Sequence, residues 1–213
     1  MKKVIYSKFD KRAISALPQV LFPGRIFVVS TAEDAKKAVD YLLGANLLGV
    51  DTETRPSFKK GETHKVSLLQ VATHDTCFLF RLNDIGITPD VKRLLENTTV
   101  PMVGLSWHDD LLSLHRRAPF KPGLFIDLQN LVGMLGIKDM SLQKLYANLF
   151  HKKISKRQQL TNWDAEVLDS KQQAYAATDA WACIQLYEEL IRLKTTGDYK
   201  LVLNNPAERG EAS

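Results

Sequence analysis

The sequence predicts an α/β fold with a mixed β-sheet flanked by helices on both faces. Strands come first and then alternate with helices, a pattern typical of this architecture. The chain has 213 residues, of which 45% are hydrophobic and 25% charged. This composition is typical of globular proteins and argues against a disordered chain. The length accommodates one large domain or at most two small ones.

The N-terminal half contains four predicted strands. Residues 1–24 form a basic leader, which we expect to be a solvated arm. Ser30 and Glu33 predict a capping box for a helix that ends at Gly44. Apolar and β-branched runs predict the strands, which are Arg25–Ser30, Leu47–Thr54, Lys65–Thr73 and Thr76–Leu82.

The C-terminal half is mainly helical and ends in a long helix. Ser170 and Gln173 predict a second capping box at its start. Apolar residues then recur at spacings of three and four, which predicts one buried stripe made of Ala174, Ala177, Trp181, Ile184, Tyr187 and Ile191. A polar tail is expected over residues 195–213. The preceding elements are strands at Pro101–Trp107 and Leu124–Asp127 and helices at Asp90–Asn97, Asp109–Arg117 and Ser141–Phe150.

The charge and the cysteines limit the functional classes. Twenty-nine Lys and Arg against 24 Asp and Glu give a net charge of +5. This excess fits an anionic partner such as nucleic acid, although many basic proteins bind nothing acidic. Cys77 and Cys183 lie in apolar stretches, so we expect buried thiols and no disulfide framework. No apolar run approaches the ~18 residues of a membrane span, and we expect a cytoplasmic protein without a membrane partner.

Four carboxylates carry the strongest chemical signal. Asp51 and Glu53 stand two residues apart at the end of an apolar strand, so their side chains leave the same face. Asp110 follows a second apolar strand and lies at the start of a helix. Asp179 lies one helical turn after Tyr175 among small residues that allow the helix to pack closely against the sheet.

Each acid also has a purely structural explanation. Asp51 could simply end a strand, and Asp109 and Asp110 could be favourable charges at a helix N-terminus. Asp179 could be paired with a basic side chain. Together, however, the four are hard oxygen ligands that suit Mg²⁺ or Mn²⁺ rather than zinc. Two such ions about 3.5–4 Å apart can promote in-line phosphoryl hydrolysis.

Three segments resemble the exonuclease motifs of the DEDD superfamily. They are Asp51–Glu53, Ser106–Asp110 and Tyr175–Asp179, and the Tyr-x-x-x-Asp spacing is typical of the DEDDy branch. This branch includes ribonuclease D, the proofreading domains of bacterial polymerases and the Werner-syndrome exonuclease domain. The resemblance covers about Arg25–Leu193. It implies a ribonuclease H-like fold and a 3′–5′ exonuclease domain over residues 25–194.

The resemblance also implies a role for each site residue. Asp51, Glu53 and Asp179 would hold the first of two ions, and Asp51 would bridge to the second. Asp110 would support the second ion through water. The Tyr175 hydroxyl would orient the attacking water, because a phenol with an ordinary pKa near ~10 is a poor base.

Asp110 is preferred to Asp109 because of its spacing from Ser106. It lies four residues after Ser106, as in the Asn-x-x-x-Asp pattern of polymerase proofreading motifs. Ser106 replaces that asparagine, so the hydrogen bonds of the asparagine do not carry over.

Contacts with nucleic acid are less clearly marked. Lys144–Arg157 holds five Lys and Arg residues and no acid, and it could clamp phosphates or be a solvated face. Phe58 and Trp107 could stack on a terminal base, although core packing is the stronger explanation for Trp107. The candidate contacts are Thr52, Trp107, Lys152, Lys153, Lys156 and Arg157.

Two functions remain open at this point. The first is a metal-dependent 3′–5′ exonuclease that uses two Mg²⁺ or Mn²⁺ ions and acts on single-stranded DNA or RNA with a free 3′ end. The alternative is a catalytically silent nucleic-acid-binding module of the same fold. The complete set of four carboxylates and Tyr175 favours the enzyme, because a silent relative is expected to have lost at least one of them.

Overall fold

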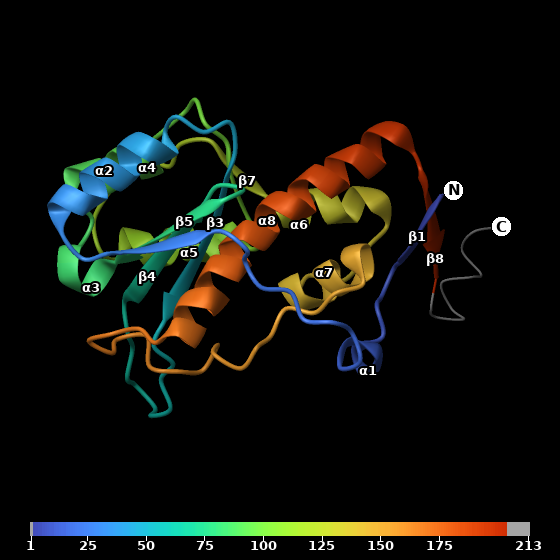
Figure 1. Cartoon of the computed structure of the whole chain (residues 1–213), viewed down its shortest axis with the longest axis horizontal. Coiled ribbons are helices and arrows are strands. Elements are labelled where there is room, and N and C mark those ends of the chain that lie inside the picture. Colours follow the sequence, from blue (N-terminus) through green and yellow to red (C-terminus); the bar gives the residue numbers. More distant parts are fainter. Residues whose placement is uncertain (1, 204–213) are drawn as a thin grey trace.

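A six-stranded mixed sheet organises the larger part of the molecule in a computed structural model that describes residues 2–203 (Figure 1). The strand order is β2-β5-β4-β3-β6-β7. The pairs β3–β4 and β4–β5 are antiparallel, whereas β2–β5, β3–β6 and β6–β7 are parallel. The strands are β2 (Arg25–Val29), β3 (Leu48–Thr54), β4 (Val66–Ala72), β5 (Thr76–Arg81), β6 (Met102–Gly104) and β7 (Phe125–Asp127).

Helices cover both faces of this sheet, which confirms the predicted architecture. The long helix α8 (Ser170–Thr196) packs on one face, mainly against β3, whereas α2 (Ala32–Leu42) and α4 (Pro89–Leu95) lie on the other. Two apolar clusters result. Along β4, Leu68 belongs to the cluster beneath α8 and Leu69 to the opposite cluster, as the alternation of side chains along a strand requires.

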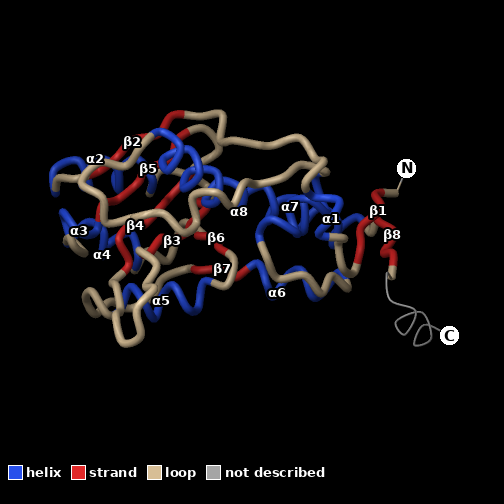
Figure 2. Tube along the Cα trace, turned by 90° about the horizontal axis from the view of Figure 1, so that it is seen from below, coloured by secondary structure: helices blue, strands red, loops and turns tan. Residues whose placement is uncertain are grey.

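The remaining elements are short. Figures 1 and 2 show α6 and α7 beside the part of α8 that extends beyond the sheet. None of the described helices is long and apolar enough to cross a membrane. These elements are β1 (Lys3–Tyr6), α1 (Lys11–Ile14), α3 (Leu82–Ile85), α5 (Trp107–His115), α6 (Leu128–Val132), η1 (Gly133–Leu135), α7 (Leu142–Phe150) and β8 (Tyr199–Val202).

Both predicted helix caps are displaced by one residue, and only the cap of α8 is a complete capping box. Helix α8 is capped by Asp169, which accepts hydrogen bonds from the backbone N–H groups of Lys171 and Gln172 at 2.8 Å, while the Gln172 side chain accepts from Asp169 N–H. Helix α2 is capped by Thr31 rather than Ser30. Aspartate and threonine are also favourable N-cap residues. The sequence pattern is therefore compatible with two helix starts, one residue apart.

The centre of α8 is buried on all sides, which the single predicted stripe did not anticipate. Every residue from Tyr175 to Ile184 is buried, including Asp179 between the stripe positions. The reason is tertiary: the sheet covers one side of this part of α8, and on another side Phe22 lies against Thr178 and Trp181.

The expectation of a solvated leader is wrong. Strand β1 pairs in parallel with β8, and Ile5 is completely buried. Strand β8 also falls within the segment predicted to be a polar tail, of which residues 204–213 lie outside the described residues. Four-residue strands carry little periodic signal, and their pairing joins segments from opposite ends of the chain. The sequence pattern alone could not reveal that contact.

Candidate active site

The site is built where β3 and α8 approach most closely. Gly49, Asp51 and Glu53 share the face of β3 that is turned toward α8. A Cβ atom at Gly49 would lie 2.0 Å from the carbonyl oxygen of Ala180, so only glycine allows this separation. The backbone contact brings Asp179, which precedes Ala180, against the two strand carboxylates.

The three carboxylates form one compact group. Each of Asp51, Glu53 and Asp179 offers an oxygen atom, and these atoms all lie within 4.8 Å of one another. They line a cavity of about 290 Å³. Glu53 and Asp179 are only 8% and 5% exposed, and Asp179 Oδ1 has no hydrogen-bond partner. The two-residue spacing in β3 and the small residues of α8 predicted that these carboxylates lie close together.

Burial raises the pKa of each of these carboxyl groups, and repulsion by neighbouring carboxylates adds to the rise for Asp51 and Glu53. Desolvation, followed by the charges of Asp51 and Asp179, raises the pKa of Glu53 to about 10. The pKa of Asp51 is well above its ordinary value for the same reasons. Burial raises the pKa of Asp179 to about 7, although a hydrogen bond from Tyr175 and the charge of Lys156 oppose the rise. The shifts show that the site disfavours three simultaneous negative charges, chiefly because the groups are removed from water.

Tyr175 lies beside Asp179 on α8 and is 8% exposed. Its ring packs against Trp163, with the ring centroids 6.0 Å apart. Burial, and then the charge of Asp179, raise the pKa of the Tyr175 hydroxyl far above its ordinary value. The hydroxyl therefore stays protonated and acts as a hydrogen-bond donor, which agrees with a positioning role rather than a basic one.

Asp110, on α5, is close enough for its charge to raise the pKa values of Asp51 and Glu53, but it neither belongs to the group of three nor lines their cavity. It accepts a short hydrogen bond from the Thr52 hydroxyl, which links α5 to β3 between the two strand carboxylates. Burial raises the pKa of Asp110 to about 6, and the hydrogen bond from Thr52 opposes the rise. Asp109 is exposed, whereas Asp110 is half-buried beside Thr52.

The start of α5 depends on Asp127, which the sequence reasoning missed. Ser106 adopts a left-handed conformation with a φ of 59°, and its side chain does not cap the helix. Instead, Asp127 at the end of β7 accepts hydrogen bonds from the N–H groups of Ser106 and Trp107 at 3.1 and 2.9 Å. Ser106 Oγ accepts from Gln129. An acid at the end of a third short strand was the signal that could have revealed Asp127.

The structure contradicts the expectation that Trp107 contacts nucleic acid. Its side chain is 1% exposed and is stacked on Phe125, with the ring centroids 5.3 Å apart. It also packs over Gly104, where a Cβ atom would lie 3.0 Å from the indole ring. Trp107 is therefore a core residue that supports α5, and no base can stack on it.

The four basic candidates occupy different surroundings. Lys156 lines the same cavity as the carboxylates, together with Thr52. Arg157 lines a neighbouring cavity, whereas the Lys153 ammonium donates to the backbone carbonyl of Ser15. Lys152 is exposed and lines neither cavity. Of the four basic candidates, Lys156 therefore lines the carboxylate cavity, and the other three do not.

These features fit a divalent cation. Three buried oxygen ligands converge without a comparable number of positive charges, and one of their oxygens lacks a partner. A cation bound among them would offset the repulsion that raises the pKa values. Carboxylate oxygens are the ligands that Mg²⁺ and Mn²⁺ prefer.

A family model described as 3′–5′ exonuclease matches residues 26–193, which include all the motif residues. The chain belongs to the 3′–5′ exonuclease family. A 3′–5′ exonuclease of Arabidopsis thaliana is 31% identical over 189 residues, covering 81% of this chain and 66% of that protein. The bifunctional 3′–5′ exonuclease/ATP-dependent helicase WRN of Mus musculus is 28% identical, covering 84% of this chain but 14% of that protein.

Solved structures show that this family member has the ribonuclease H-like fold predicted from its motifs. The exonuclease domain of Aedes aegypti Nibbler superposes with a TM-score of 0.73 at 19% identity, over 88% of this chain and 94% of that one. Escherichia coli ribonuclease D gives a TM-score of 0.72 at 18% identity, over 81% of this chain and 46% of that one.

Proposed function

We propose that this exonuclease-family chain hydrolyses the terminal phosphodiester bond of DNA or RNA at a free 3′ end, with two Mg²⁺ or Mn²⁺ ions. The observation that carries the proposal is the buried group of Asp51, Glu53 and Asp179, whose oxygens lie within 4.8 Å of one another. Divalent ions held there would activate water and stabilise the leaving oxygen.

Each side chain has a separate task in this proposal. Asp51, Glu53 and Asp179 would hold the first ion, and Asp51 would also contribute to the second. Asp110, which accepts a hydrogen bond from Thr52, would support the second ion. The protonated Tyr175 hydroxyl orients the attacking water in line with the scissile bond.

Thr52, Lys156 and Arg157 are the proposed contacts with the strand, together with the more distant Lys152 and Lys153. Lys156 is the basic candidate that lines the carboxylate cavity, where the reacting phosphate would lie. Neutralising Lys156 should reduce the salt dependence of single-strand affinity by about 0.7 in log–log slope, the effect of losing one phosphate contact. Neutralising Lys36, an exposed lysine of α2 on the other face of the sheet, is the matched control.

RNA and DNA are both candidate substrates in this proposal. The ribonuclease D of Trypanosoma brucei, solved in complex with RNA U12, superposes on this chain with a TM-score of 0.68 at 22% identity, over 80% of this chain and 63% of that one. Parallel digestion of single-stranded DNA, single-stranded RNA and recessed duplexes would identify the preferred polymer.

Incubation of 5′-labelled oligonucleotides with Mn²⁺ tests the function itself. We expect a ladder of products shortened from the 3′ end that disappears when a chelator is added. A chain that binds the oligonucleotide but leaves it intact with either metal would instead be the catalytically silent module.

A further inference from the structure

The N-terminal segment forms one wall beside Tyr175. Residue Val20 donates its N–H to the carbonyl of Lys153 at 3.0 Å, and Lys153 donates back to the carbonyl of Pro18 at 2.9 Å. Two residues further on, Phe22 N–H donates to the Thr178 hydroxyl on α8 at 2.9 Å. These bonds fix residues 18–22 between α8 and the segment that contains Lys153. This wall precedes residues 26–193, the part matched by the family model.

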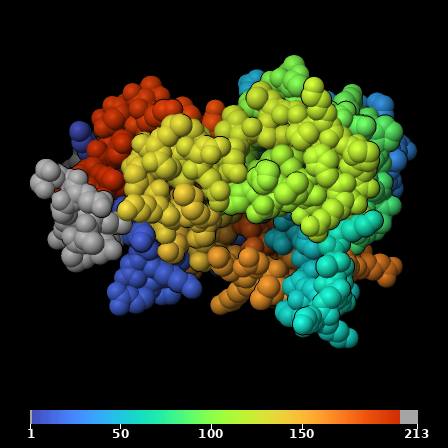
Figure 3. Space-filling view, turned by 180° about the vertical axis from the view of Figure 1, so that it is seen from behind, coloured from blue at the N-terminus to red at the C-terminus, as the bar shows by residue number. Residues whose placement is uncertain are grey.

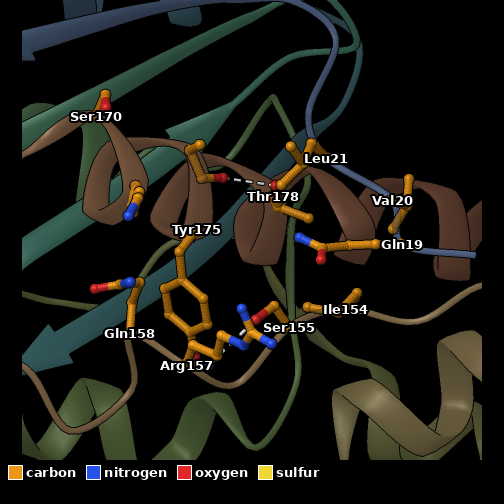
Figure 4. A pocket seen from close by; sticks show the side chains of 12 residues that line it. Gln19, Val20, Leu21, Ile154, Ser155, Arg157, Gln158, Ser170, Tyr175 and Thr178 are labelled. Atoms are coloured by element: carbon orange, nitrogen blue, oxygen red, sulfur yellow. Dashed lines mark hydrogen bonds between the residues drawn. The ribbon is translucent and has the colours of Figure 1, made fainter. Parts of the chain in front are cut away.

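The wall encloses a second cavity of about 370 Å³ beside the carboxylates. Its surface is largely apolar and is formed by Val20, Leu21, Ile154, Ala174 and the ring of Tyr175 (Figure 4). Leu21 is 52% exposed. An exposed leucine at the rim of an apolar cavity supplies a surface on which a flat, apolar group could pack.

Polar and positive groups surround this apolar surface. Arg157 and Lys171 are exposed at the cavity and provide positive charge for phosphates. Gln19 and Gln158 supply amide groups that can both donate and accept hydrogen bonds. An apolar slot with amide groups and cations at its edge matches a nucleotide, which combines a flat base, polar base edges and a phosphate.

The two cavities adjoin. Tyr175, Ile154 and Ser155 line both of them, so the tyrosine proposed to position water at the carboxylates also forms part of the second cavity. Figure 4 shows the Tyr175 ring extending from α8 toward Arg157 and Ser155. A strand whose terminal phosphodiester lies at the carboxylates can therefore place a neighbouring nucleotide in the second cavity.

We propose that the cavity between residues 19–21 and α8 binds one unpaired base of the substrate strand, close to the scissile bond. This inference rests on the proposed exonuclease function and gives residues 19–21 a part in holding the strand. A base that enters the cavity cannot remain paired, in keeping with the single-stranded substrate expected from the sequence.

Oligonucleotides that lack one base test the proposal. A series of single strands carries one abasic site at successive positions from the 3′ end, and kcat/KM is measured with Mn²⁺. Affinity is measured in parallel by fluorescence anisotropy with Ca²⁺ in place of Mn²⁺. The variants are Leu21→Ala and, as a control, Leu112→Ala, because Leu112 is also 52% exposed and does not line the cavity.

We expect one abasic position to weaken binding to the wild-type protein by about tenfold, the usual scale for loss of one base contact. Leu21→Ala should weaken binding of the intact strand by a similar factor and cause no further loss at that position. Leu21→Met should restore binding, and Leu112→Ala should behave as wild type.

Two results would overturn the subsite. One is wild-type binding of the intact strand by a folded Leu21→Ala protein, and the other is an equal loss at every abasic position. Absence of cleavage by the wild-type protein would refute the proposed function instead, and the affinity series would still decide whether the cavity binds a base.

Discussion

The carboxylates between β3 and α8 differ from Asp110 in what surrounds them. Asp179 is 5% exposed and has one oxygen without a hydrogen-bond partner. Asp110 is less deeply buried and accepts a hydrogen bond from Thr52. The pKa of Glu53 is raised to about 10, whereas that of Asp110 is raised to about 6.

The difference in burial and hydrogen bonding follows from the elements that carry these carboxylates. Strand β3 is paired on both sides and lies against α8 through Gly49, so its carboxylates cannot turn away from one another. Asp110 stands in the first turn of a nine-residue helix whose start is held by Asp127. A cation would balance the charge of the group between β3 and α8, whereas the Thr52 hydroxyl already compensates part of the charge of Asp110.

Among the variants considered, Asp51→Asn should cause the largest loss of activity. The amide removes the carboxylate proposed to be shared by both ions, so cleavage should become undetectable in the oligonucleotide assay. Asp109→Asn is the control, since Asp109 is an exposed acid beside Asp110 and should retain wild-type turnover. Wild-type turnover by Asp51→Asn would show that the site is assigned wrongly.

Tyr175→Phe and Asp179→Ala separate positioning from metal binding. Removal of the hydroxyl should reduce the single-turnover rate by ~10²-fold, about 2.7 kcal/mol of barrier. Mn²⁺ affinity measured by calorimetry should hardly change, because phenylalanine removes no ligand. Asp179→Ala should weaken Mn²⁺ binding and abolish activity. If Tyr175→Phe cleaves at the wild-type rate, the tyrosine has only a packing role.

The pH dependence of stability should report the same charge repulsion. The folded protein holds a proton on Glu53 up to a pKa of about 10, whereas the unfolded chain releases it near its ordinary value. Because the folded state then binds more protons, its free energy of unfolding falls as the pH rises. Without metal, Tm should fall by ~5 °C between about pH 6 and pH 8.

Millimolar Mn²⁺ should abolish most of that fall, since the ion compensates the carboxylate charges. Asp51→Asn provides a second comparison. It removes one repelling charge, so the metal-free variant should be more stable than the wild type at about pH 8. A metal-free Tm that does not change over this range would contradict the proposed repulsion.

Thr52→Val should produce the smallest effect on the rate, and its effect on the pH dependence should act through Asp110. The hydrogen bond from Thr52 lowers the pKa of Asp110, so its loss should raise that pKa by about one unit. The acid limb of the rate profile should move to higher pH, with a several-fold loss near pH 6 and little change near pH 8. Thr52→Ser keeps a hydroxyl and should leave the profile unchanged.

The sequence by itself determined the features that depend on local geometry. The two-residue spacing of Asp51 and Glu53 placed both on one face of a strand, because side chains alternate along β-structure. The small residues around Asp179 indicated close packing of its helix. The three motifs, in their order and spacing, predicted the family, and the comparisons confirmed it.

Only the tertiary structure decided the features that join distant segments. Trp107 follows the same strand as Asp110, yet it is buried against Phe125. The leader, residues 1–24, was expected to be solvated. Instead, β1 pairs with β8 and residues 19–21 line the cavity beside Tyr175. Residue type and periodicity report which surface an element prefers to bury, whereas the partner that covers it is fixed when packing joins elements far apart in the chain.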